Sequence, residues 1–83
     1  MGNRAASLSY EVALTPHHPD EDVDRIVGYL SDPSQGFSWV AVEDDGTIAV
    51  KLHAANIDDA ERRVRSSLDD ADRVRLDVGH PPL

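Results

Sequence analysis

A β-hairpin is predicted by residues 37–53, which read FSWVAVEDDGTIAVKLH. Residues 37–43 and 47–53 are rich in β-branched and aromatic side chains, and the tripeptide Asp44-Asp45-Gly46 separates them. Glycine tolerates the left-handed conformation that closes a three-residue hairpin loop with a bulge. The length of this loop matters because a shift of one residue in register moves every side chain of a strand to the opposite face of the sheet.

A strand and an amphipathic helix are predicted before this hairpin. Residues 7–14 alternate apolar and polar side chains, which is typical of a half-buried strand, and the two prolines in residues 15–19 interrupt it. A helix is expected from Pro19, with acidic residues in its first turn, where the helix dipole favours negative charge. One face of this helix carries an apolar stripe formed by Val23, Ile26, Val27 and Leu30.

The same two types of element are predicted after the hairpin. Asn56 is expected to cap a second helix, with Asp59 in a position that resembles a capping box. The inner stripe of this helix would consist of Ile57, Ala60, Val64 and Leu68. Residues 73–78 alternate again and predict a last strand, in which Val74, Leu76 and Val78 face inward and Arg73, Arg75 and Asp77 face outward.

The order strand, helix, strand, strand, helix, strand predicts an α+β fold. Two β-α-β units with right-handed crossovers, joined by a hairpin, give a ferredoxin-like βαββαβ two-layer sandwich. Its antiparallel sheet would have the order 4-1-3-2 and both helices on one face. We expect a single domain over residues 1–83, with flexible tails at 1–6 and 79–83, because a chain of 83 residues is too short for two cores.

The hairpin register decides whether Trp39 lies on the open face of this sheet or in the core. With a three-residue loop Val40 pairs with Val50, and Trp39 faces away from the helices. With a two-residue turn Trp39 would pair with Leu52 and be buried. We favour the three-residue loop, and we expect a partner-binding surface on the open face, formed by Phe37, Trp39, Lys51, His53, Arg73 and Arg75.

Composition excludes several classes of protein. The chain has 8 basic and 16 acidic residues, a formal charge of −8, and no cysteine. The absence of cysteine favours a reducing, cytoplasmic location, and no apolar run is long enough to suggest a signal peptide or a membrane anchor. Nucleic-acid binding is disfavoured because it relies on basic residues. The local basic cluster consists of Arg62, Arg63 and Arg65 with Arg73 and Arg75. We expect these arginines to pair with the carboxylates along the second helix: Asp58, Asp59, Glu61 and Asp69.

Metal binding and catalysis have weak support in the sequence. His17, His18 and Asp20 are the best metal candidates, but adjacent histidines between prolines rarely converge on one ion, and the acidic residues already suit the start of a helix. His53 lacks an evident orienting acid and nucleophile. We therefore expect no cofactor and no catalytic residue.

These patterns favour a small, acidic, non-enzymatic module that binds protein and self-associates through its open sheet face or its edge strands. One alternative is a ligand-binding or enzymatic domain whose cleft forms at a dimer interface lined by Trp39, His53, Lys51 and Arg75. Another alternative is an acidic mimic of nucleic acid, with carboxylates aligned along the helical layer at Asp20, Asp24, Asp58 and Glu61.

Overall fold

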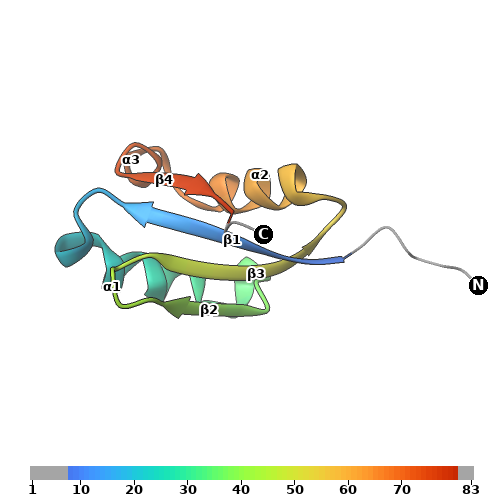
Figure 1. Cartoon of the computed structure of the whole chain (residues 1–83), viewed down its shortest axis with the longest axis horizontal. Coiled ribbons are helices and arrows are strands. Elements are labelled where there is room, and N and C mark those ends of the chain that lie inside the picture. Colours follow the sequence, from blue (N-terminus) through green and yellow to red (C-terminus); the bar gives the residue numbers. More distant parts are fainter. Residues whose placement is uncertain (1–7, 81–83) are drawn as a thin grey trace, which may run out of the picture.

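The computed structural model describes residues 8–80, and Figure 1 shows their arrangement. The strands are β1 (Leu8–Pro16), β2 (Trp39–Val42), β3 (Ile48–Ala54) and β4 (Leu76–Gly79). The helices are α1 (Pro19–Leu30), α2 (Ile57–Ser67) and the short α3 (Asp70–Arg73), with a 3-10 turn, η1 (Pro33–Gln35), between α1 and β2. The N-terminal residues 1–6 and the last residues 81–83, which we expected to be tails, lie outside the described residues.

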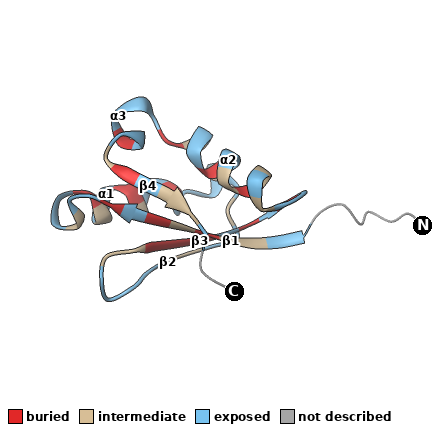
Figure 2. Ribbon diagram, turned by 45° about the horizontal axis from the view of Figure 1, so that its top comes forward, coloured by how far each residue is buried: buried red, intermediate tan, exposed pale blue. Residues whose placement is uncertain are grey.

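The strands form one antiparallel sheet with the order β2-β3-β1-β4. Both α1 and α2 lie on the same face of this sheet, and no helix of residues 8–80 lies on the other face (Figure 2). The predicted two-layer α+β class is therefore confirmed. None of the helices in residues 8–80 is long and apolar enough to cross a bilayer.

The hairpin has the three-residue loop that we favoured. Val40 pairs with Val50, and Trp39 pairs with Lys51. The Glu43 N–H donates to the Thr47 carbonyl at 2.8 Å, and the Gly46 N–H donates to the Glu43 carbonyl at 2.9 Å. Gly46 has a φ of +89°, which is the left-handed conformation that glycine adopts at low cost.

The hairpin loop also touches the start of α1. A Cβ atom at Gly46 would lie 2.8 Å from Cβ of Pro19, which is closer than such atoms normally approach. Asp45 stabilises the loop, because its carboxylate accepts a hydrogen bond from the Thr47 N–H at 2.9 Å. That bond lowers the pKa of Asp45 below its usual range. The left-handed backbone conformation of residue 46 and the close approach of Pro19 therefore both require a glycine at this position.

The core lies between the helices and the sheet. Ile26 and Leu30 of α1 are buried, and so are Val64 of α2 and Leu68, which directly follows the end of α2. Val23, Val27 and Ile57 are partly buried at the margin of the core. Both predicted helical stripes are therefore confirmed as the inner faces. The sheet contributes the buried side chains of Val12, Leu14, Ile48, Val50, Leu52, Ala54 and Leu76.

Strand β1 is longer than we expected, because it continues through Thr15 to Pro16. The β3 partners of β1 end with Ile48 opposite Leu14, so Pro16 has a partner only in β4, at Leu76. Proline has no N–H to donate, but at a position with a partner strand on one side only this loss does not interrupt the hydrogen bonds in the middle of the sheet. At the other end of β1, Leu8 is 57% exposed although it has the inward phase.

The predicted last strand is wrong at its start. Residues 70–73 form α3 instead, because Asp69 caps this turn by accepting a hydrogen bond from the Asp72 N–H at 2.9 Å. Strand β4 therefore begins only at Leu76, and Val74, which we expected to face inward, is 74% exposed. Gly79, which we placed in the C-terminal tail, pairs with Ala13.

Candidate functional site

The residues predicted to form one partner-binding surface lie in three places. Trp39 and Lys51 are together on the open face of the sheet. Phe37 and His53 line a cavity at the edge of the sandwich. Arg73 and Arg75 lie outside the sheet and make ion pairs elsewhere.

The side chains of Trp39 and Lys51 stack on the open face. Lys51 Nζ lies 4.6 Å from the centroid of the Trp39 ring, which is within the range of a cation–π contact. Trp39 nevertheless remains 44% exposed. The prediction that Trp39 lies on the open face is therefore confirmed, and Lys51 covers part of its ring.

A row of small residues crosses the open face beside Trp39. Ala41 of β2 pairs with Ala49 of β3, Ala49 pairs with Ala13 of β1, and Ala13 pairs with Gly79 of β4. We call these four residues the small-residue row. Ala49, in the middle of this row, is only 2% exposed, whereas Ala41, Ala13 and Gly79 are partly exposed. Small residues thus run across the sheet next to the large Trp39 side chain, but the centre of the row is not open to solvent.

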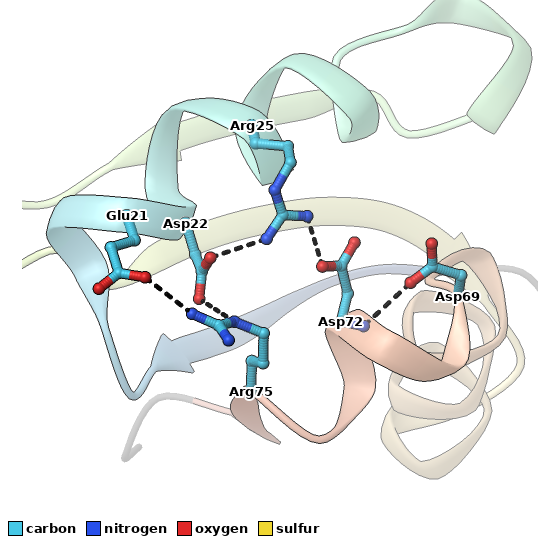
Figure 3. A network of polar contacts seen from close by, with 6 residues as sticks. All are labelled: Glu21, Asp22, Arg25, Asp69, Asp72 and Arg75. Carbon is cyan, nitrogen blue, oxygen red and sulfur yellow. Dashed lines mark hydrogen bonds and ion pairs between the residues drawn. The ribbon is translucent and has the colours of Figure 1, made fainter.

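Arg75 faces the first turn of α1 and not the open face (Figure 3). Its Nε donates to Asp22 at 2.8 Å and its Nη2 to Glu21 at 3.1 Å. Arg25 donates to Asp22 at 2.7 Å and also to Asp72 of α3. Asp22 therefore lies between two guanidinium groups, and the network joins α1 to the segment that precedes β4.

Asp22 is 2% exposed, which explains why its partners matter. The hydrogen bond from Arg75 is the main cause that holds the pKa of Asp22 below its ordinary value of 3.8, and Arg25 adds to this effect against the cost of burial. A buried carboxylate needs charged partners. The contacts of Asp22 with Arg25 and Arg75 are therefore explained by a structural role, which is to hold α1 against the segment before β4. They do not support a catalytic role.

Arg73 is also wrongly placed by the sequence prediction. Its Nε donates to the Leu68 carbonyl at 3.0 Å, and its Nη1 lies 3.2 Å from a carboxylate oxygen of Asp70. The helical turn α3 takes Arg73 out of the alternation of β4, so it cannot share a face with Trp39. Arg73 and Arg75 are paired with carboxylates, but their partners, Asp70 for Arg73 and Glu21 and Asp22 for Arg75, are not the ones that we expected along the second helix.

A cavity of about 500 Å³ lies where the loop after η1 meets the ends of β3 and α2. Phe37 does not lie beside Trp39 as we expected, because β2 begins only at Trp39 and Phe37 packs against the core. His53 is exposed at the mouth of the cavity. The remaining lining residues come from the loop, β3 and α2: Gln35, Gly36, Leu52, Arg62, Arg63, Ser66 and Ser67.

The role of α2 in this cavity was missed by sequence reasoning, although the signal was present. Arg62, Arg63 and Ser66 follow Asp59 at helical spacings of three, four and seven, so the four residues share one face of the helix. Asp59 accepts hydrogen bonds from Arg62 at 2.7 Å and from Arg63 at 3.0 Å. We predicted this pairing as surface stabilisation and did not expect a cavity beside it.

The metal candidates do not converge. His17 Nε2 lies 3.4 Å from Asp77, and residues 8–80 contain no group of three or more histidine, aspartate or glutamate side chains suited to hold a metal ion. A second hollow, of about 380 Å³, lies between the start of α1 and the hairpin loop and is acidic. Its carboxylates are those of Asp20, Asp24, Glu43, Asp44 and Asp45.

Comparisons of the chain with protein-family models, with curated proteins and with solved structures found no match.

Proposed function

We propose that this protein is a small, non-enzymatic interaction module that associates with a second copy of itself through the open face of its sheet. The observation that carries the proposal is the 44% exposure of Trp39 on a face that no helix covers. Tryptophan is enriched among the residues that dominate protein interfaces. Its contact with Lys51 orders the ring in advance, which lowers the entropy lost on binding.

A second copy is the occupant that the chemistry of this face favours. Lys51 has Trp39 as its neighbour on β2 and Glu11 as its neighbour on β1. In a two-fold symmetric dimer, Lys51 of each copy can pair with Glu11 of the other, so one favourable contact is made twice.

We also infer that the two layers form a ferredoxin-like arrangement. The support is that α1 connects β1 to β2 and α2 precedes β4, and that the strand order reads β4-β1-β3-β2 when it starts from the other edge. This fold leaves one face of its sheet open, as the proposal requires. We propose a cytoplasmic location on the separate ground that the sequence contains no cysteine.

The test is the mass of the protein in solution, measured by light scattering and sedimentation up to high micromolar concentration. We expect a concentration-dependent dimer for the wild type. Trp39→Ala should weaken dimerisation several hundred-fold, because a central tryptophan typically contributes about 2 kcal/mol to an interface and the two-fold dimer loses one from each copy. The matched control is Tyr29→Ala, since Tyr29 is 45% exposed on α1, in the opposite layer.

A strict monomer at the highest concentration would overturn the proposal. It would also be overturned if Tyr29→Ala weakened the dimer as much as Trp39→Ala, because the contact would then involve the helical layer. Circular dichroism and urea unfolding of each variant establish that the loss of dimer is not a loss of folding.

A further inference from the structure

We propose that the cavity between the η1–β2 loop, β3 and α2 binds a small organic anion: a phosphate or carboxylate group attached to a flat apolar body. This site is separate from the self-association surface, and nothing in its argument depends on Trp39. Its volume of about 500 Å³ lies within the range of small-molecule sites in proteins, roughly 300–1,000 Å³.

The charge of the cavity is opposite to that of the molecule. The protein has a formal charge of −8, but the charged side chains that line the cavity are Arg62 and Arg63, and none of its lining residues is a carboxylate. His53 adds a ring that is a hydrogen-bond donor when protonated. An anion that approaches this acidic protein is therefore attracted at this place and repelled by the carboxylate-rich hollow beside α1.

Arg62 and Arg63 are held in position for this role. Asp59 accepts one hydrogen bond from Arg62, one from Arg63 and one from the Ala55 N–H at 3.1 Å. The bond from Arg62 is the main cause that lowers the pKa of Asp59, so this carboxylate stays ionised and keeps both arginines in place. One carboxylate cannot neutralise two guanidinium groups, and each guanidinium has five N–H donors. Donors and positive charge thus remain for an oxyanion, which guanidinium groups bind in a bidentate manner.

The other lining residues predict the rest of the ligand. Phe37 and Leu52 provide apolar surface, and Phe37 packs against the hydrophobic core, so its ring is a fixed wall. An aromatic or similarly flat group suits a phenyl wall. Gln35 and Ser66 place an amide and a hydroxyl at the same cavity. Ser67 offers only its lone pairs, because its hydroxyl donates to the Val64 carbonyl at 2.6 Å.

The experiment is a titration of ¹⁵N-labelled protein, followed by amide and arginine Nε shifts, with phenyl phosphate, benzoate and inorganic phosphate as separate probes. We expect saturable shifts at Gly36, His53 and Ser66 with phenyl phosphate or benzoate, and the tighter of the two identifies the anionic group. Inorganic phosphate alone should bind at least 10-fold more weakly, because it cannot use the wall formed by Phe37.

Three variants test which side chains bind the anion. Arg62→Gln and Arg63→Gln should each weaken binding about 10-fold. Arg65→Gln is the matched control, since it makes the same change in charge on the same helix outside the cavity, and it should change binding less than 2-fold. All three positions are exposed, so the variants are expected to fold.

Three results would overturn the proposal. The first is an absence of saturable shifts with phenyl phosphate and benzoate. The second is equal weakening by Arg65→Gln, which would mean that the anions are only attracted to α2 in general. The third is equal affinity for inorganic phosphate and phenyl phosphate, which would remove the apolar part of the ligand. None of these results bears on the dimer, which is measured separately.

Discussion

Trp39 and Tyr29 are exposed to almost the same degree, 44% and 45%, but they stand on opposite layers of the molecule. Single exposed aromatic residues are normal on protein surfaces. Trp39 differs from Tyr29 because a cation lies on its ring and a row of small residues runs beside it. Its surroundings, and not its exposure alone, therefore mark it as a candidate for contact.

Gly46 is the residue at which a single methyl group should cost most. In Gly46→Ala the new Cβ would sit in a left-handed backbone conformation and 2.8 Å from Pro19. We expect a loss of about 2 kcal/mol in the free energy of unfolding, from backbone strain and the shift of Pro19 together. Urea denaturation measures this loss.

The control for Gly46 is Gly28→Ala, because Gly28 lies in α1 and an added Cβ there meets no atom within 4 Å. Alanine has the higher helix propensity, so this variant should gain about 0.5–1 kcal/mol. Equal effects at the two positions would show that neither the conformation nor the contact at Gly46 matters for stability.

At the scale of elements, Asp22 connects α1 to the segment before β4 through Arg25 and Arg75. Its pKa is lower in the folded protein than the ordinary value of 3.8, so the native state releases this proton more readily than the unfolded state does. The resulting stability is fully present well above pH 3.8. It is lost as the pH falls from 3.8 through the lower pKa of the folded state.

Asp22→Asn should therefore lower stability at pH 7 and flatten its dependence on pH. The wild type and the variant should approach each other as the pH falls from 3.8 through the lower pKa that Asp22 has in the folded protein, because protonation removes the charge that the two arginines stabilise. Urea unfolding between pH 2.5 and pH 7 measures this. Asp24→Asn, an exposed neighbour on α1, should leave the slope near that of the wild type, and parallel slopes for Asp22→Asn would contradict the account.

Local patterns were sufficient to predict the hairpin register and the inner faces of α1 and α2. Asp44-Asp45-Gly46 closes its own loop, and the apolar stripes repeat within each helix. The placement of Arg75 could not be predicted in this way, because its partner Asp22 is 53 positions away in the sequence. The cavity at Phe37 and Arg63 also depends on packing between distant segments. The turn α3 is a local feature that we missed although Asp69 carries an ordinary N-cap signal.

At the scale of the whole molecule, the charge of −8 opposes self-association. Two copies repel each other over long distances, and salt screens this repulsion, with a Debye length of about 8 Å at physiological ionic strength. The Lys51–Glu11 pairs of the proposed dimer would be in direct contact, and direct pairs are screened less than distant charges. We therefore expect the dimer to become severalfold tighter between low salt and about 0.15 M NaCl.

Sedimentation at several NaCl concentrations tests this expectation, with no variant needed. A dimer that weakens steadily with salt would mean that opposite charges carry the contact, which contradicts the role given to Trp39. The same series separates self-association from the nucleic-acid-mimic alternative. A complex between acidic surfaces such as Asp20 and Asp24 and a basic protein should weaken steeply as salt is added.

The charged connection at Asp22 also has a consequence for the far end of the chain. Strand β4 has one buried residue, Leu76, and one partly buried residue that packs against the core, Val78, so the ion pairs of Arg75 directly before it add to a small apolar contact. We expect acid that neutralises Asp22 to loosen β4, Leu76–Gly79, before the rest of the fold. The edge of β1 from Ala13 to Pro16 would then lose its partner, and an unpaired strand edge favours pairing with another chain.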